Sequence, residues 1–311
     1  EIIVASTEQD CTKERKEIAM AASLDAYAAN LVVAPSKATV PAQLHRPIVE
    51  ACKSALSSRS SFVIALSGGS LPSFLSSIDT SFQAAGVDPH FDKWHILLAD
   101  ERCVPSTDDD SNLKALKENF LDGVAVPLSQ IYGIDESLLG DSHTTEEVAA
   151  AYESTALASA LSAGDGKIDC AVLGFGPDGH TCSLFPGHPL LEETEKHVAP
   201  ITDSPKPPPN RITLTLPVLN TMTRSVVFCG AGSSKGPILK AVFEGINAKT
   251  DGDGGATEAK AFKVSMSDPA PYPCGLVRPE GKDLLLSPPV TWVVDEDAAK
   301  DLNLDQCASQ L

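Results

Sequence analysis

The spacing of apolar residues changes repeatedly between helical and extended along this chain, which predicts helices and strands in alternation. Leu44, Ile48, Cys52 and Ala55 recur at the spacing of one helix face. Residues 62–66 then form a short, wholly apolar run, which is typical of a strand covered on both faces. Runs of the same character follow at residues 94–99, 168–173, 212–216, 225–229 and 291–294.

Helical patterns separate several of these runs. One helix is predicted from residue 112 to about 121, and another over residues 296–302. A third, rich in alanine, begins at the capping box formed by Thr144 and Glu147 and ends before Gly164. Strands separated by helices indicate a Rossmann-like α/β fold, which is an open, mainly parallel sheet with helices on both faces.

We assign residues 36–311 to a single domain of this kind. Residues 1–35 are predicted to form an N-terminal extension with a helix of uncertain role. Residues 202–210, rich in proline, and residues 247–261, rich in glycine and charge, have no periodic apolar face. Because the strand pattern resumes after each of them, we predict surface loops rather than linkers between domains.

Composition and charge narrow the range of partners. The chain has 311 residues, of which 42% are apolar, and a net charge of −18. Long-range attraction to nucleic acid or to an anionic membrane is therefore not expected, and an anionic ligand would need a local cluster of basic residues. None of the apolar runs approaches the roughly 20 residues that span a bilayer.

The cysteines are dispersed, without the paired spacing of a metal site, and several lie in apolar runs. We interpret them as buried free thiols of a protein from a reducing compartment and expect a cytoplasmic location. Because Glu1 is not an initiating residue, a removed targeting sequence stays open as an alternative. The cysteines are Cys11, Cys52, Cys103, Cys170, Cys182, Cys229, Cys274 and Cys307.

Polar clusters follow four of the predicted strands, at residues 67–70, 100–102, 176–180 and 230–235. Ligands of open α/β sheets bind beyond the carboxyl ends of the strands, so these clusters are expected to meet at one edge.

Two of the clusters have the character of an anion site. The backbone N–H groups of Ser67, Gly68, Gly69 and Ser70 precede a predicted helix and could face a phosphate. Lys235, after a glycine- and serine-rich turn, could meet the same phosphate as a point charge. The alternatives are a tight turn that needs its glycines and a lysine at the solvated surface.

The other two clusters have the character of a catalytic site. Gly176 and Pro177 predict a rigid turn that exposes His180, with Asp178 placed to orient its ring, and an oriented histidine is a natural general base. Asp100 and Arg102 could supply a carboxylate and an oxyanion donor, or simply form a charged rim.

Two further groups have simpler interpretations. Residues 108–112 resemble a calcium loop but lack its glycine and terminal glutamate, which favours helix capping. His188 is expected to shape a loop.

At these residues the sequence resembles the 6-phosphogluconolactonase family, within the superfamily that also contains glucosamine-6-phosphate isomerase/deaminase. The matching stretches are residues 66–70, 99–102, 110–112, 174–187 and 210–215 and the region of Lys235.

The resemblance implies hydrolysis of 6-phospho-D-glucono-1,5-lactone, in the oxidative pentose phosphate pathway, without a metal or organic cofactor. His180 would take a proton from water, and Arg102 would bind the oxyanion or the phosphate. The residues of the 67–70 loop and Lys235 would bind the phosphate, and Asp100 would belong to the same substrate-binding group. Arg211 would reach the site only if its strand runs antiparallel. The partner expected is the small sugar-phosphate lactone alone, and a monomer is one expectation for a chain whose oligomeric state is open.

Two rival functions share parts of this pattern. The deaminase branch would use Asp100 for proton transfer, but it is expected to continue Ile-Ala-Phe-Asn-Glu where this chain has residues 181–185, Thr-Cys-Ser-Leu-Phe. It would also carry an aromatic residue in place of Arg102. A non-catalytic sugar-phosphate sensor would not need Asp178 and His180.

Overall fold

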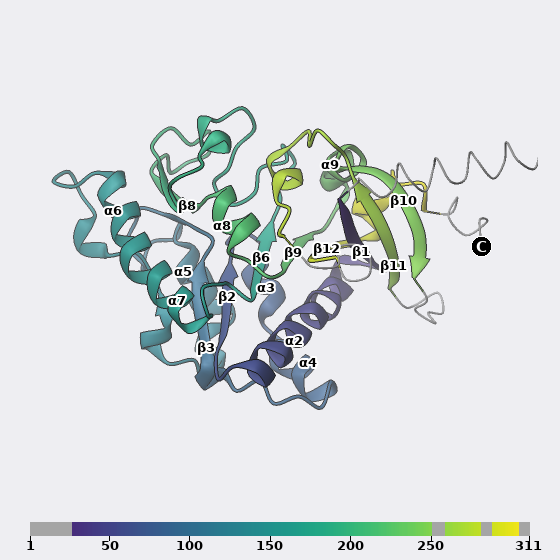
Figure 1. The fold of residues 1–311 in the computed structure, drawn as a ribbon, viewed down its shortest axis with the longest axis horizontal. Helices are drawn as coiled ribbons and strands as arrows, with labels where there is room; N and C mark the ends of the chain where they lie inside the picture. Colours follow the sequence, from purple (N-terminus) through teal and green to yellow (C-terminus); the bar gives the residue numbers. More distant parts are fainter. Residues whose placement is uncertain (1–26, 251–258, 281–287, 305–311) are drawn as a thin grey trace, which may run out of the picture.

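A nine-stranded sheet dominates the part of the chain that the computed structural model describes, which comprises residues 27–250, 259–280 and 288–304. Seven neighbouring strands run parallel, and a β10–β11 hairpin adds antiparallel to β1 at one edge (Figure 1). In spatial order the strands are β10 (Phe243–Thr250), β11 (Lys260–Met266), β1 (Ala28–Ala34), β12 (Val290–Asp295), β9 (Val226–Gly230), β6 (Cys170–Gly174), β2 (Phe62–Leu66), β3 (Trp94–Leu98) and β5 (Ile131–Tyr132).

Helices cover both faces of this sheet, as the sequence predicts. Every residue of β2 and of β9 is buried, which requires cover on each side. The helices are α2 (Val40–Ser58), α3 (Leu71–Leu75), α4 (Ile78–Ala84), α5 (Asn112–Asn119), α6 (Thr145–Tyr152), α7 (Ala158–Ala163), α8 (Leu216–Thr221), α9 (Gly236–Val242) and α10 (Glu296–Ala299).

The local signals for two helices are confirmed. The predicted apolar face of α2 is buried at Leu44, Ile48 and Cys52. At the start of α6 the Thr144 hydroxyl accepts from the Glu147 N–H at 3.2 Å, and the Glu147 carboxylate accepts from the Thr144 N–H at 2.7 Å. This reciprocal pair is the predicted capping box.

Three strands form a second, antiparallel sheet, and here the prediction needs correction. β8 (Arg211–Leu214) lies between β4 (Asp100–Arg102) and β7 (Val198–Ile201), away from the parallel strands to which it was assigned. A four-residue buried run looks the same in either sheet. The pairing direction is set by the 202–210 segment, a loop as predicted, which turns the chain back from β7 into β8.

The expectations for the N-terminus and for residues 247–261 also need correction. Residues 28–34 are not part of a separate extension but form β1, between β11 and β12 (Figure 1). They lie within the segment in which a helix was expected, yet their burial is that of an inner strand. The strands β10 and β11 take up both ends of the second predicted loop. Residues 1–26 and 251–258 lie outside the described part.

The order of the strands locates a crevice. From β2 the chain proceeds outward to β3 and β5, and then returns to β6 on the other side of β2 and continues to β9 and β12. The loops that follow β2 and β6 therefore diverge, which is where open α/β sheets bind ligands. Within the described ranges, no helix has the length and apolar character needed to cross a bilayer.

A buried histidine joins three helices beside this crevice. His45 of α2 contacts the Ser81 hydroxyl of α4 through Nδ1 and the Phe74 carbonyl of α3 through Nε2, both at 2.7 Å. A neutral ring satisfies both contacts by donating from Nε2 and accepting at Nδ1. Burial lowers the pKa of His45, and the contact with Phe74 opposes that shift only in part.

We predict that His45 makes the stability of the protein depend on pH. Because its pKa is lower in the folded than in the unfolded state, its contribution is full above about pH 6.5 and is lost as the pH falls, by up to about 1.4 kcal/mol per pH unit. Urea unfolding between pH 7.5 and 5.5 should therefore show a steeper loss of free energy of unfolding for the wild type than for His45→Gln. Equal slopes would contradict this prediction.

Candidate active site

A cavity of about 390 Å³ opens at the carboxyl ends of β2, β6 and β9, beside the second sheet. Of the ten residues predicted from the sequence, nine line it, and the tenth, Asp178, contacts one of them. The nine are Ser67, Gly68, Gly69, Ser70, Asp100, Arg102, His180, Arg211 and Lys235.

The turn that carries His180 is built around two glycines. The Gly176 N–H donates to the His180 carbonyl at 2.9 Å, and the Gly179 N–H donates to the Gly176 carbonyl at 3.0 Å. Gly179 has a φ of 79°, which side chains disfavour. A Cβ on Gly176 would lie 2.0 Å from His180 Nδ1 and 2.2 Å from Asp178 Oδ1. Only glycine at position 176 lets the backbone of the turn approach the side chains of Asp178 and His180 this closely.

Asp178 orients the imidazole. Its Oδ1 lies 2.5 Å from His180 Nδ1, a separation that requires a proton between the two atoms. With that proton on Nδ1, Nε2 keeps a free electron pair. The Phe185 ring stacks on the imidazole with centroids 5.0 Å apart.

The charges of this pair follow from their surroundings. Burial lowers the pKa of His180, while the hydrogen bond with Asp178 acts to raise it. Burial acts to raise the pKa of Asp178, but the hydrogen bond and charge of His180, together with Lys206, hold it at about 2. At neutral pH the pair is therefore a carboxylate beside a neutral ring.

The loop after β2 presents free backbone donors to the cavity. The N–H groups of Gly68 and Gly69 donate no hydrogen bond within the described part of the chain. A Cβ on Gly68 would lie 1.8 Å from Asn112 Oδ1, so only glycine fits against this side chain. Asn112 Nδ2 in turn donates to the Asp100 carbonyl at 2.8 Å, which ties α5 to β4.

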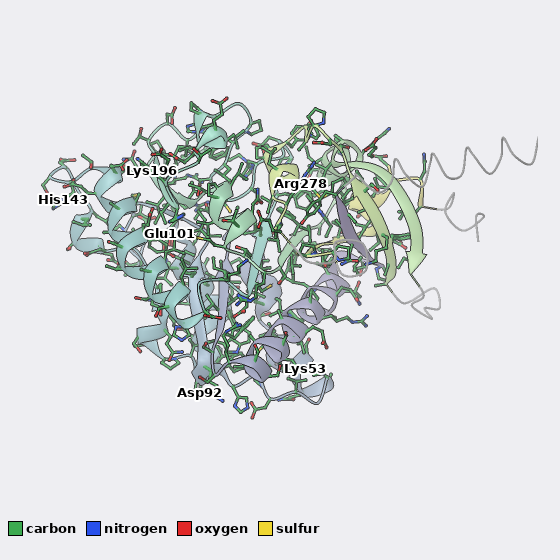
Figure 2. All side chains as sticks on the ribbon, viewed as in Figure 1. Lys53, Asp92, Glu101, His143, Lys196 and Arg278 are labelled. Atoms are coloured by element: carbon green, nitrogen blue, oxygen red, sulfur yellow. The ribbon has the colours of Figure 1, made fainter. Side chains whose placement is uncertain are left out.

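Alternation along β4 separates a structural carboxylate from two residues that line the cavity. Glu101 is 1% exposed, lies in the interior of the molecule (Figure 2) and accepts from the N–H groups of Asn112 and Leu113 at 2.8 and 2.9 Å. It thereby anchors the start of α5, and its burial raises its pKa. Asp100 and Arg102 line the cavity.

Ser111 and Ser183 fix the neighbouring polar groups. Ser111 caps α5 by accepting from the Lys114 N–H at 3.2 Å, so the predicted helix cap in residues 108–112 is confirmed. The Ser183 hydroxyl donates to Asp100 Oδ2 at 2.9 Å.

Arg102 and Arg211 lie opposite each other on the antiparallel β4–β8 ladder. The strand of Arg211 therefore has the antiparallel direction that this residue needs to reach the site. Most of the Arg211 guanidinium is engaged by the loop before it: Nε donates to the Pro208 carbonyl, and Nη2 donates to the carbonyls of Lys206 and Pro207, each at 2.9 Å. Burial and the charge of Arg102 lower the pKa of Arg211. Its main contacts are thus those of a clamp on residues 206–208.

Lys235 lies over the Phe175 ring, with Nζ 5.1 Å from the centroid, and donates to the Phe175 carbonyl. Burial, and then the charge of Lys206, lower the pKa of Lys235. A lysine held in this way at the cavity wall is more than a solvated surface residue.

Two lysines of the cavity wall were missed by the sequence analysis. Lys37 follows β1, and Lys206 comes from the proline-rich loop that was treated only as surface. The Lys206 Nζ lies 3.3 Å from Asp178 Oδ2 and 3.0 Å from His180 Nδ1. Pro205 and Pro207 on either side of it were the available signal, because such a loop is rigid enough to hold a charge in place.

The lining explains how so acidic a chain could bind an anion. Its charged side chains comprise Lys37, Arg102, Lys206, Arg211 and Lys235 against the single carboxylate of Asp100. Among the described residues, three or more histidine, cysteine, aspartate or glutamate side chains nowhere gather as a metal site would require. The local positive charge of the cavity comes from these lysine and arginine side chains.

The loop histidine and the described cysteines agree with expectation. His188 accepts from the Leu190 N–H at 3.2 Å and contacts Asp203, so it shapes its loop. The cysteines that the structure describes are free thiols, most of them buried.

Comparison with known proteins places this chain in a family. A model described as "Glucosamine-6-phosphate isomerases/6-phosphogluconolactonase" matches residues 35–286. The chain belongs to this family. It is 43% identical over 187 residues to the rat protein named 6-phosphogluconolactonase, covering 60% of this chain and 70% of the relative. It is 36% identical over 246 residues to the human protein of the same name, covering 79% and 83%.

The fold is that of solved members of the family. The structure of 6-phosphogluconolactonase from Trypanosoma cruzi matches 89% of this chain and 98% of its own, with a TM-score of 0.67 at 22% sequence identity. The open α/β sheet predicted from the sequence is therefore confirmed.

We predict that Gly176→Ala breaks the Asp178–His180 pair, because the new methyl group overlaps both side chains. The low-field proton resonance expected for Nδ1–H in so short a hydrogen bond should disappear from the NMR spectrum, and the melting temperature should change by only a few degrees. Gly174→Ala is the matched control, since a Cβ there meets nothing within 4 Å. Persistence of the resonance in Gly176→Ala would contradict the geometry.

Proposed function

We propose that this chain hydrolyses 6-phospho-D-glucono-1,5-lactone to 6-phospho-D-gluconate, a step of the oxidative pentose phosphate pathway. The observation that carries the proposal is the His180–Asp178 pair, 2.5 Å between Nδ1 and Oδ1, in a cavity rich in cationic side chains. An oriented neutral imidazole suits the activation of water, and local cations suit a phosphorylated substrate. The names of the rat and human relatives support the same reaction.

The proposed chemistry needs one general base. Water bonds to the lactone carbonyl carbon while its proton passes to His180 Nε2, and the carbonyl electrons move to the oxygen as an oxyanion. When the carbonyl re-forms, the bond to the ring oxygen breaks and His180 returns the proton to that oxygen, which becomes a hydroxyl group. The new carboxylic acid then releases a proton to solvent, and His180 is neutral again.

The remaining residues divide between the two ends of the substrate. Arg102, opposite Arg211 on the β4–β8 ladder, is assigned to the oxyanion. The phosphate is assigned to Lys235 and to the loop of residues 67–70, in which the N–H groups of Gly68 and Gly69 are free. Asp100, held by Ser183, faces the sugar hydroxyl groups. Because Arg211 donates to the carbonyls of residues 206–208, we assign it to holding this loop rather than to binding the phosphate directly.

The proposal includes a small-molecule substrate as the partner, no nucleic acid, no organic or metal cofactor, and a monomer in the cytoplasm. The net charge of −18 supports a protein that does not bind nucleic acid, and the free thiols support a cytoplasmic location. Relatives from rice are named as probable chloroplastic forms, so the location is to be tested by imaging of the tagged full-length protein.

We expect His180→Ala to lower the enzymatic rate by about two to four orders of magnitude, the usual contribution of a positioned general base. The measurement is the initial rate of 6-phosphogluconolactone hydrolysis after subtraction of the enzyme-free rate, because the lactone also opens spontaneously. His188→Ala, in a loop outside the cavity lining, should stay within threefold of the wild type. A His180→Ala rate that close to the wild type would remove the base from the mechanism.

We expect Lys235→Ala to reduce kcat/KM about ten- to a hundredfold for the phosphorylated lactone, since a charge-assisted hydrogen bond contributes roughly 1.5 to 3 kcal/mol. Turnover of unphosphorylated gluconolactone should scarcely change. Lys240→Ala, exposed on α9, serves as the matched lysine control. Equal impairment of both lactones by Lys235→Ala would mean that this side chain does not bind the phosphate.

A further inference from the structure

Lys206 is a cation placed against the catalytic pair on the side away from the reacting nitrogen. Its Nζ lies 3.0 Å from His180 Nδ1 and 3.3 Å from Asp178 Oδ2. Because the Nδ1 proton is already given to Asp178 Oδ1, Lys206 cannot also donate to Nδ1, and its charge pairs with the second carboxylate oxygen as an ion pair. One carboxylate is therefore shared between a histidine and a lysine.

The position of Lys206 is built into the loop. Its N–H donates to the Ser204 hydroxyl at 3.3 Å, and that hydroxyl donates to the Lys206 carbonyl at 2.9 Å. The same carbonyl accepts from Arg211 Nη2 at 2.9 Å. On the other side, the Lys206 Nζ lies 5.9 Å from the centroid of the Phe185 ring, which also stacks on His180.

The charges around His180 show why this placement matters. Asp178 on its own turn and Asp100 on β4 favour a protonated imidazole, whereas burial and Lys206 favour a neutral one. Lys235, the other lysine beside this end of the cavity, interacts with Lys206 and Asp178. A protonated His180 has no electron pair at Nε2 and could not accept a proton from water. A carboxylate 2.5 Å away would, without a counter-charge, move the ring toward that inactive form.

We propose that Lys206 is a positioning residue that shares Asp178 with His180 and so keeps the imidazole neutral and competent as a base near neutral pH, and that Arg211 holds the loop in the register this requires. The proposal rests on the lactonase function above for its catalytic meaning. Its electrostatic part concerns only the unliganded protein, and can be tested without substrate.

The first test is an NMR titration of the His180 ring protons in the whole, unliganded protein. Lys206→Met should raise the pKa of His180 by about one unit or more, because a neighbouring positive charge is lost while the carboxylate stays. Lys206→Arg should keep the pKa close to that of the wild type. Lys37→Met is the matched control, since it removes the same charge from the cavity wall at a residue that is not among the charges acting on His180. Its shift should be less than a third of that in Lys206→Met.

The second test is the pH dependence of kcat/KM. Loss of Lys206 should move the acid limb of the profile to higher pH by the same amount as the NMR titration, so that activity falls roughly tenfold below the midpoint and recovers above it. Lys206→Arg should restore the wild-type midpoint. If Lys206 were only a phosphate ligand, Lys206→Met would raise KM at every pH and leave the midpoint unchanged.

The outcomes separate the two proposals. A His180 pKa that is the same in Lys206→Met and in the wild type would overturn the role of Lys206, even if the protein hydrolyses the lactone. A shifted pKa in a protein without lactonase activity would instead overturn the proposed function and leave the electrostatic role of Lys206 standing. Circular dichroism on each variant confirms that it is folded.

Discussion

The pairing of β4 with β8 is the interaction on which the site depends. It places Arg102 opposite Arg211, and because β8 runs antiparallel, the loop that precedes it is brought back over the cavity. Arg211 then uses Nε and Nη2 to hold three successive carbonyls of that loop. A short ladder outside the main sheet thereby delivers Lys206 to a histidine that comes from a different strand.

The site also holds several positive charges close together. Two arginines side by side and two nearby lysines repel one another, and burial makes that repulsion costly. The cost is offset by backbone carbonyls, which accept from Arg102, Arg211 and Lys235, and by the carboxylate of Asp178. The result is a cavity that is poor in negative charge within a chain of net charge −18, suited to a ligand that the rest of the surface repels.

Close approach of backbone to side chains gives the site its rigidity. Gly68 and Gly176 have no room for a Cβ against Asn112 and His180, so the strand ends and the functional side chains are packed in contact. Glu101 supports this arrangement from the far side by tying the start of α5 to β4. A site held on strand ends and tight turns needs little reorganisation when a substrate binds.

Much of this was determined by the sequence itself. The apolar runs predicted the parallel strands β2, β3, β6, β9 and β12. The clusters at their ends predicted about half of the residues that line the cavity, because strand ends in a parallel sheet must meet at one edge. The short runs at residues 28–34 and 211–214 were placed wrongly or left out. The local pattern of apolar residues indicates that a strand is buried, but it does not indicate which strand lies next to it. Only the packed structure brings Arg102 next to Arg211. For the same reason Lys206, with no local signal but the prolines around it, becomes a partner of His180 only through the tertiary fold.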